Sequence, residues 1–68
     1  MKVFEERLKE QRKLYGLTQR EMAERLGVSQ PSYIRYENGT AEPSQASLVK
    51  IADIFDVSVD YLLGRADI

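Results

Sequence analysis

Apolar and polar residues in the centre of the chain follow a helical period. Between residues 19 and 38 the apolar positions that fit this period are Met22, Ala23, Leu26, Val28, Tyr33 and Tyr36. The pattern predicts two short amphipathic helices that share one buried side. Gly27 breaks the pattern between them, and glycine accepts the left-handed backbone that a tight corner needs. With Ala23 as the small residue where the helices meet, the spacing predicts a helix-turn-helix over about residues 18–38. A corner between two helices of an ordinary bundle is the alternative.

The residues that begin these two helices can be read from the sequence. Residues 18–21, Thr-Gln-Arg-Glu, form a capping box, so the first helix is expected to begin there and to end near Leu26. Ser29 can cap the second helix, with Pro31 in its first turn, where a missing amide proton breaks no helical hydrogen bond. The second helix, which would be the recognition helix of a DNA-binding motif, is expected over about residues 29–38.

Three more segments with helical character flank this pair. Residues 3–15 contain neither Gly nor Pro, and Gly16 is expected to end that helix. The other two segments begin with Ser44 and Ser58, and serine is a residue type that caps helices. Leu14 lies off the apolar stripe of the first segment, so either the packing is wide there or Leu14 is exposed. The apolar positions with helical spacing in these segments are Phe4, Leu8, Tyr15, Leu48, Ile51, Ala52 and Phe55. The pattern as a whole predicts an all-α domain of five short helices.

Length and composition narrow the possible functions. The 68 residues allow one domain, residues 1–68, with one modest core. The absence of Cys and His excludes disulfides and the usual transition-metal ligands, and we expect no metal and no cofactor. No apolar run approaches the roughly 20 residues of a membrane span. The chain therefore reads as a cytoplasmic protein with no membrane partner.

Charge is distributed unevenly along the chain. The net charge is −1, whereas proteins that bind nucleic acid usually carry a basic surplus. Residues 1–40 nevertheless hold eight Lys or Arg and six Asp or Glu, and residues 41–68 hold two and five. This weak asymmetry favours an acidic end that faces away from a polyanion, although random surface charge would look similar.

The motifs taken together resemble a known family. The order Leu-Thr-Gln-x-x-x-Ala-x-x-x-Gly-Val-Ser, then Ile-Arg-Tyr-Glu-Asn-Gly, then Pro-Ser and Leu-x-x-Ile-Ala is similar to the phage-repressor-like helix-turn-helix family, also called the xenobiotic-response-element type. The resemblance covers about residues 5–64, and the ending Val-Ser-Val-Asp-Tyr-Leu-Leu-Gly looks like members from Gram-positive bacteria and their prophages. It implies a compact five-helix, lambda-repressor-like domain. The implied function is a homodimeric transcription regulator, by expectation a repressor, that binds double-stranded DNA sequence-specifically.

The resemblance also implies which residues read base edges. The matching positions are Gln30, Pro31, Ser32, Ile34 and Arg35. Gln30 can pair with adenine and Arg35 with guanine, each good pair giving roughly 1–3 kcal/mol of discrimination, while Pro31 and Ile34 offer apolar contact to a thymine methyl. Pro31 stands where many relatives carry a polar residue, which argues against a base hydrogen bond there. The alternative for Arg35 is a phosphate contact or a surface ion pair.

A second set of positions matches residues that contact the DNA backbone in the family. These positions are Arg12, Thr18, Gln19, Asn38, Gly39 and Thr40. The resemblance implies that Gln19 bonds a phosphate and also braces the recognition helix. It would begin a helix, where free amides and a partial positive charge suit a phosphate. Thr40 stands where a lysine is frequent, so the salt dependence of binding should be shallower. At residues 38–40, family members present main-chain amides to the sugar-phosphate backbone. The alternatives are a solvated Gln19 and an ordinary turn at residues 38–40.

One ion pair and one apolar surface complete the expectations. Arg12 and Glu37 match an arginine and a glutamate that pair in the family, although two independent surface charges are the alternative. The end of the chain is more apolar than a short edge helix needs, so we expect a dimer face at Val59, Tyr61, Leu62, Leu63 and Ile68. Two recognition helices about 34 Å apart would then require a near-palindromic operator. Alternatively, these residues cover the groove between the first and fourth helices.

Two other classes of function compete with DNA binding. A protein-interaction module such as an antitoxin or an antirepressor could use the same fold, and the acidic pI and the apolar tail favour it. An enzyme is the poorest match, because the carboxylates have the spacing of solvated helix faces. The sequence contains no nucleophile and base pattern and no phosphate-binding glycine loop.

Overall fold

The computed structural model describes residues 2–68, and this part of the chain is all-α with five helices, as the sequence predicts. The first two helices are α1 (Lys2–Leu14) and α2 (Gln19–Leu26), and the third is α3 (Gln30–Asn38). They are followed by α4 (Gln45–Phe55) and the single turn α5 (Val59–Leu62). Within residues 2–68, no helix combines the length and the hydrophobicity that crossing a lipid bilayer requires.

Hydroxyl side chains begin four of the five helices. The oxygens of Thr18, Ser29, Ser44 and Ser58 each accept a hydrogen bond from the backbone amide three residues later. At α2 the capping box is complete, because Glu21 also accepts from the amide of Thr18 at 2.9 Å. Each such cap typically contributes about 1 kcal/mol, so local sequence alone sets most helix starts in this small domain.

Left-handed residues end the helices of the central pair. Gly27 follows α2 with φ 70° and Gly39 follows α3 with φ 79°. Asp56 does the same after α4 with φ 53°, and is the one non-glycine residue between positions 2 and 68 with a positive φ. Because the helices end at these residues, only short loops connect them, and consecutive helices must pack beside one another.

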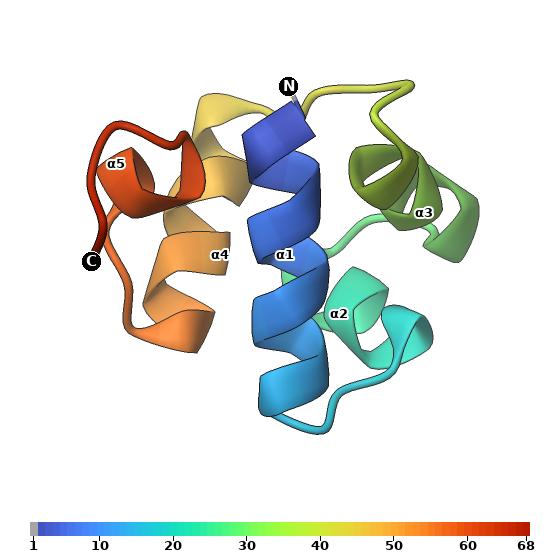
Figure 1. The fold of residues 1–68 in the computed structure, drawn as a ribbon. Coiled ribbons are helices and arrows are strands. Elements are labelled where there is room, and N and C mark those ends of the chain that lie inside the picture. Colours follow the sequence, from blue (N-terminus) through green and yellow to red (C-terminus); the bar gives the residue numbers. More distant parts are fainter. Residues whose placement is uncertain (1) are drawn as a thin grey trace.

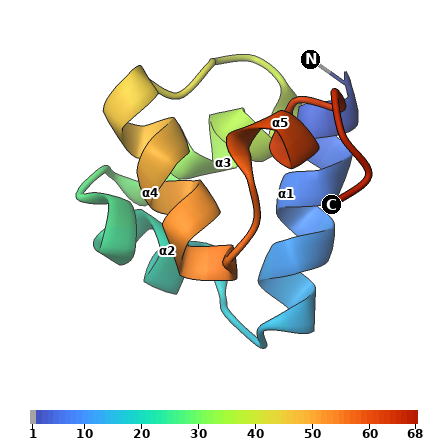
Figure 2. The ribbon, with the colours of Figure 1, turned by 90° about the vertical axis from the view of Figure 1, so that its left-hand side faces the viewer.

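The helices contact one another in a ring around the core. In Figure 1, α1 stands between α2 and α3 on one side and α4 and α5 on the other. The main contacts join α1 to α3, α3 to α2, α2 to α4, α4 to α5, and α5 back to α1. Seen after a quarter turn, α5 lies across the upper part of α1, and the final segment turns back along α1 (Figure 2). The helix-turn-helix is therefore braced by α1 on one flank and α4 on the other.

The core draws on every helix. Its buried apolar residues are Phe4, Leu8, Met22, Ala23, Leu26, Tyr33, Tyr36, Ile51, Ala52, Phe55 and Leu62. Of the two alternatives for Leu14, wide packing or exposure, the structure shows exposure, at 75%. Tyr15 is half-exposed, with its ring against Phe55. Leu62 is completely buried. Its expected place in a dimer face was therefore wrong. The alternative, that it covers the groove between the first and fourth helices, fits this burial, because α5 packs against both α1 and α4.

Candidate nucleic-acid interface

The two sides of α3 differ sharply in burial. Tyr33, Tyr36 and Glu37 are buried and hold the inner side of the helix in the domain. On the outer side, Gln30, Pro31 and Arg35 are exposed, and Ser32 and Ile34 are half-buried. The structure thus leaves all five candidate base-reading residues at least partly accessible, and we call this set of residues the α3 face.

Two side-chain hydrogen bonds and a proline constrain the first turn of α3. The Ser29 hydroxyl accepts from the Ser32 amide at 3.2 Å and donates to the Ser32 hydroxyl oxygen at 2.9 Å. Pro31 fixes the backbone between them. The start of the α3 face therefore has a defined backbone before anything binds to it, which lowers the ordering entropy of recognition.

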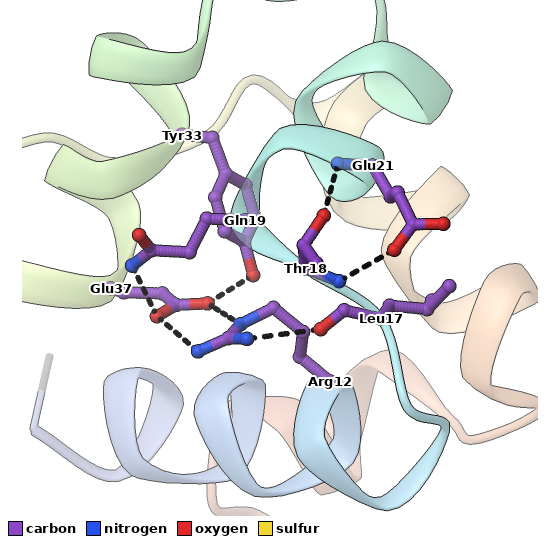
Figure 3. A network of polar contacts seen from close by, with 7 residues as sticks. All are labelled: Arg12, Leu17, Thr18, Gln19, Glu21, Tyr33 and Glu37. Carbon is purple, nitrogen blue, oxygen red and sulfur yellow. Dashed lines mark hydrogen bonds and ion pairs between the residues drawn. The ribbon is translucent and has the colours of Figure 1, made fainter.

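Behind the α3 face lies a network of polar contacts centred on the Glu37 carboxylate (Figure 3). Arg12 reaches it from α1 through Nε to Oε2 at 2.6 Å and through Nη2 to Oε1 at 3.3 Å. Gln19 donates from the start of α2 through Nε2 to Oε1 at 3.1 Å, and the Tyr33 hydroxyl donates to Oε2. Arg12 also donates to the Leu17 carbonyl at 3.0 Å. One buried carboxylate thus ties α1 and α2 to α3.

The network shifts the ionisation of its members. Burial raises the pKa of Glu37, but the hydrogen bonds from Arg12, Tyr33 and Gln19 outweigh it, so this pKa lies below its usual value. The hydrogen bond to Glu37 raises the pKa of Arg12. Burial, with the hydrogen bond to Glu37, raises the pKa of Tyr33 far above its ordinary range. At neutral pH the site therefore holds a carboxylate, a guanidinium and a neutral phenol.

Sequence reasoning placed Arg12 and Glu37 together but missed two of the donors to Glu37. The Tyr33 hydroxyl could have been found, because residues four apart on a helix share a face. The resemblance implied that Gln19 contacts a phosphate and braces the recognition helix, but it did not name the partner. The bond of Gln19 to Glu37 joins α2 to α3 across 18 positions and is such a brace. That contact depends on the angle between two helices, which no local pattern encodes.

The loop after α3 is exposed at all three candidate positions, Asn38, Gly39 and Thr40. The amides of Gly39 and Thr40 both donate to the Arg35 carbonyl and so close the helix. We had expected main-chain amides here to face a DNA backbone, but these two already have an acceptor. The side chains of Asn38 and Thr40 are what the loop can offer instead. The Glu5 carboxylate packs so closely against Gly39 that a Cβ there would overlap it.

The end of the chain is fastened to α1. The Arg7 guanidinium lies 4.2 Å from the centre of the Tyr61 ring, and its Nη1 donates to the carbonyls of Tyr61 and Ala66, the latter at 2.7 Å. Val59, Tyr61 and Leu63 are half-buried, whereas Ile68 is 91% exposed. These residues therefore cover part of the α1 surface and also leave apolar area accessible.

The candidate site contains no cluster of metal ligands. Across the described residues, 2–68, no group of three or more His, Cys, Asp or Glu is arranged to hold a metal ion. The side chains on the α3 face are suited to hydrogen bonding and apolar contact.

Comparisons with known proteins agree with this geometry. The sequence profile described as Helix-turn-helix matches residues 8–62. The chain is 49% identical over 61 residues to the uncharacterized HTH-type transcriptional regulator YqaE of Bacillus subtilis (strain 168), covering 90% of this chain and 53% of that protein. It is 48% identical over 62 residues to the cryptic phage CTXphi transcriptional repressor RstR of Vibrio cholerae, covering 91% and 55%.

A solved structure has the same arrangement of helices. The P22 c2 repressor protein, crystallised in complex with synthetic operator 9T in the presence of Tl+, superposes with a TM-score of 0.86 at 26% identity. The match covers 94% of this chain and 97% of that one. The chain spans only about half the length of the curated relatives it matches.

Proposed function

This chain belongs to the Helix-turn-helix family, and we propose that it is a sequence-specific regulator of transcription, a repressor, that binds double-stranded DNA. The observation that carries the proposal is the α3 face, on which five candidate base-reading side chains remain accessible while the opposite side of α3 is locked in the core. The relation to the repressor RstR and to the P22 c2 repressor bound to its operator supports it. Regulation would work by occupying DNA, with no chemical step.

The α3 face would lie in the major groove, which is about 12 Å wide and admits one α-helix. Arg35 would donate two hydrogen bonds to guanine, and Gln30 would pair with adenine. Pro31 and Ile34 offer apolar surface to a thymine methyl, and the Ser32 hydroxyl would take part as a hydrogen-bonding group. These five contacts would supply the sequence preference.

Backbone contacts would set the position of the domain on the duplex. Thr18 and Gln19 lie at the start of α2, where the helix dipole favours an anion. Asn38 and Thr40 lie on the loop after α3 and would contact phosphates through their side chains, with Gly39 between them beside the Glu5 carboxylate. Arg12 pairs with Glu37, which compensates its charge, and would contact a phosphate only through the N–H groups that Glu37 and the Leu17 carbonyl leave unused.

The functional unit would be a homodimer on a near-palindromic operator. The half-exposed Val59, Tyr61 and Leu63 and the exposed Ile68 would form the contact between two copies. In a dimer, the two α3 helices enter successive major grooves about 34 Å apart, so half-sites would repeat with that spacing.

Selection of preferred duplexes from a random pool tests the proposal. We expect enriched sequences with two related half-sites about one helical turn apart, and binding that weakens as salt rises. No enrichment over the starting pool, together with stable binding to a protein partner, would favour the protein-interaction module and refute the proposal.

A further inference from the structure

The proposed function assigns no role to the hydroxyl of Tyr33. This side chain is completely buried on the inner side of α3, and its hydroxyl donates to Glu37 Oε2. A phenylalanine ring has almost the same shape and would fill the same place in the core. The contribution that belongs to the hydroxyl alone is therefore its hydrogen bond to Glu37.

The Glu37 carboxylate is fully engaged. A carboxylate offers about four acceptor sites, and here it accepts four hydrogen bonds from three donors. Oε2 takes Arg12 and Tyr33, while Oε1 takes Arg12 and Gln19. The carboxylate is 2% exposed, so water cannot easily replace a donor that is removed. Loss of one donor therefore favours rotation of the carboxylate toward its remaining partners.

Rotation of the Glu37 carboxylate would change its hydrogen bond with the Gln19 amide. Because a carboxylate can only accept hydrogen bonds, the amide nitrogen of Gln19 must be the end that faces Glu37. One Nε2 proton is used in that bond, and in the described part of the chain it is the only hydrogen bond of the Gln19 side chain. The second Nε2 proton remains for an external acceptor, and a DNA phosphate is an acceptor. Glu37 thus selects the amide orientation that a phosphate needs.

We infer that Tyr33 is a positioning residue, whose buried hydroxyl holds the Glu37 carboxylate in the orientation that aims the Gln19 amide at a DNA phosphate. The inference rests on the proposed function for its last step, because only DNA supplies the phosphate. Its first step concerns the free protein. Tyr33 itself touches no DNA in this arrangement, since the whole side chain lies inside the domain.

The first step is tested without DNA by the side-chain amide NMR signals of Gln19 in the wild type and in Tyr33→Phe. Tyr36→Phe is the matched control, since Tyr36 lies on the same helix with its ring 6.2 Å from that of Tyr33, and its hydroxyl makes no hydrogen bond within residues 2–68. We expect the Gln19 signals to shift in Tyr33→Phe and to stay in place in Tyr36→Phe. Unchanged Gln19 signals in Tyr33→Phe, or equal shifts in both variants, would overturn the inference.

The second step is tested by combining Tyr33→Phe with Gln19→Ala and measuring affinity for the selected operator and for a random duplex of equal length. Residues that act on a binding site through neighbours change affinity by roughly two- to thirtyfold, and we expect a roughly three- to tenfold loss in Tyr33→Phe, equal on both duplexes. In the Gln19→Ala background the same change should have no further effect.

Two results would overturn the second step alone. Losses that simply add in the double variant would mean that Tyr33 does not act through Gln19, and a loss confined to the operator would mean that the α3 face itself has moved. A wild-type chain that binds no duplex would instead refute the proposed function, and the phosphate step with it.

Discussion

Replacing Glu37 with glutamine should destabilise the domain far more than a change of one atom type suggests. Four hydrogen bonds point at the two oxygens of Glu37, and a carboxamide has only one oxygen. Gln19 can turn its amide and Tyr33 can turn its hydroxyl, but the guanidinium of Arg12 can only donate. At least one Arg12 nitrogen must therefore face an NH2 group, with its charge no longer compensated.

The magnitude follows from burial. Removing one partner of a buried ion pair costs roughly 3–5 kcal/mol. The Arg12 side chain is 13% exposed and so keeps some hydration, which places the expected loss near the lower end, at about 3 kcal/mol. A domain of this size has roughly 3–10 kcal/mol of stability in total. Glu37→Gln should therefore move the urea midpoint strongly, because it removes roughly a third or more of the total stability.

The pH dependence of this loss in stability provides a second and independent test. The pKa of Glu37 is lowered in the folded state, so its stabilising contribution is complete above the pKa of the unfolded chain and is lost as pH falls through the folded value. The difference in unfolding free energy between wild type and Glu37→Gln should be largest at neutral pH and should shrink below about pH 4.

Urea unfolding followed by circular dichroism between pH 3 and pH 7 measures both effects. Glu24→Gln is the matched control, because its pair with Arg20 is 3.4 Å long and both side chains are more than two-thirds exposed. Such a pair contributes about 0–1 kcal/mol. A loss in Glu37→Gln no larger than in the control, or one that does not change with pH, would refute the reasoning.

Three further predictions concern binding. Arg35→Ala should lower affinity for the selected operator by roughly ten- to hundredfold and for random DNA much less, whereas Gln19→Ala should weaken both equally, which competition binding measures. Equal selectivity of the two variants would contradict base reading by Arg35. Glu5→Gln should raise affinity for every duplex several-fold at low salt, because the carboxylate beside Gly39 opposes a nearby phosphate; unchanged affinity would place the loop away from DNA. Truncation after Gly64 should weaken the dimer, and an unchanged mass in solution would remove the tail from the interface.

The helices themselves could be predicted because their signals are local. The capping box at Thr18, the proline in the first turn of α3 and the left-handed Gly27 each act within one helical turn, and each is found where the sequence predicts it. The inward and outward sides of α3 follow from the helical period. Tyr33 and Tyr36 are three positions apart and so lie on the same side of the helix.

What could not be predicted depends on helices that are distant in the sequence. Leu62 was assigned to a dimer face because the end of the chain is so apolar, with the groove between the first and fourth helices as the alternative. Its complete burial, on a helix that packs against both α1 and α4, favours the alternative for this residue. The main-chain amides of Gly39 and Thr40 were expected to face DNA. Both instead donate to the Arg35 carbonyl, and this pairing depends on how α3 ends. The contact of Gln19 with Glu37 depends on the crossing angle of α2 and α3.

The central claim is that the α3 face contacts base pairs while the rest of the domain holds it in place. Titrating the isotopically labelled chain with its selected operator and following every backbone amide by NMR tests this most directly. We expect the largest changes on residues 30–35, with smaller ones at residues 18–19 and 38–40. Largest changes at residues 59–68, with residues 30–35 unmoved, would contradict this claim.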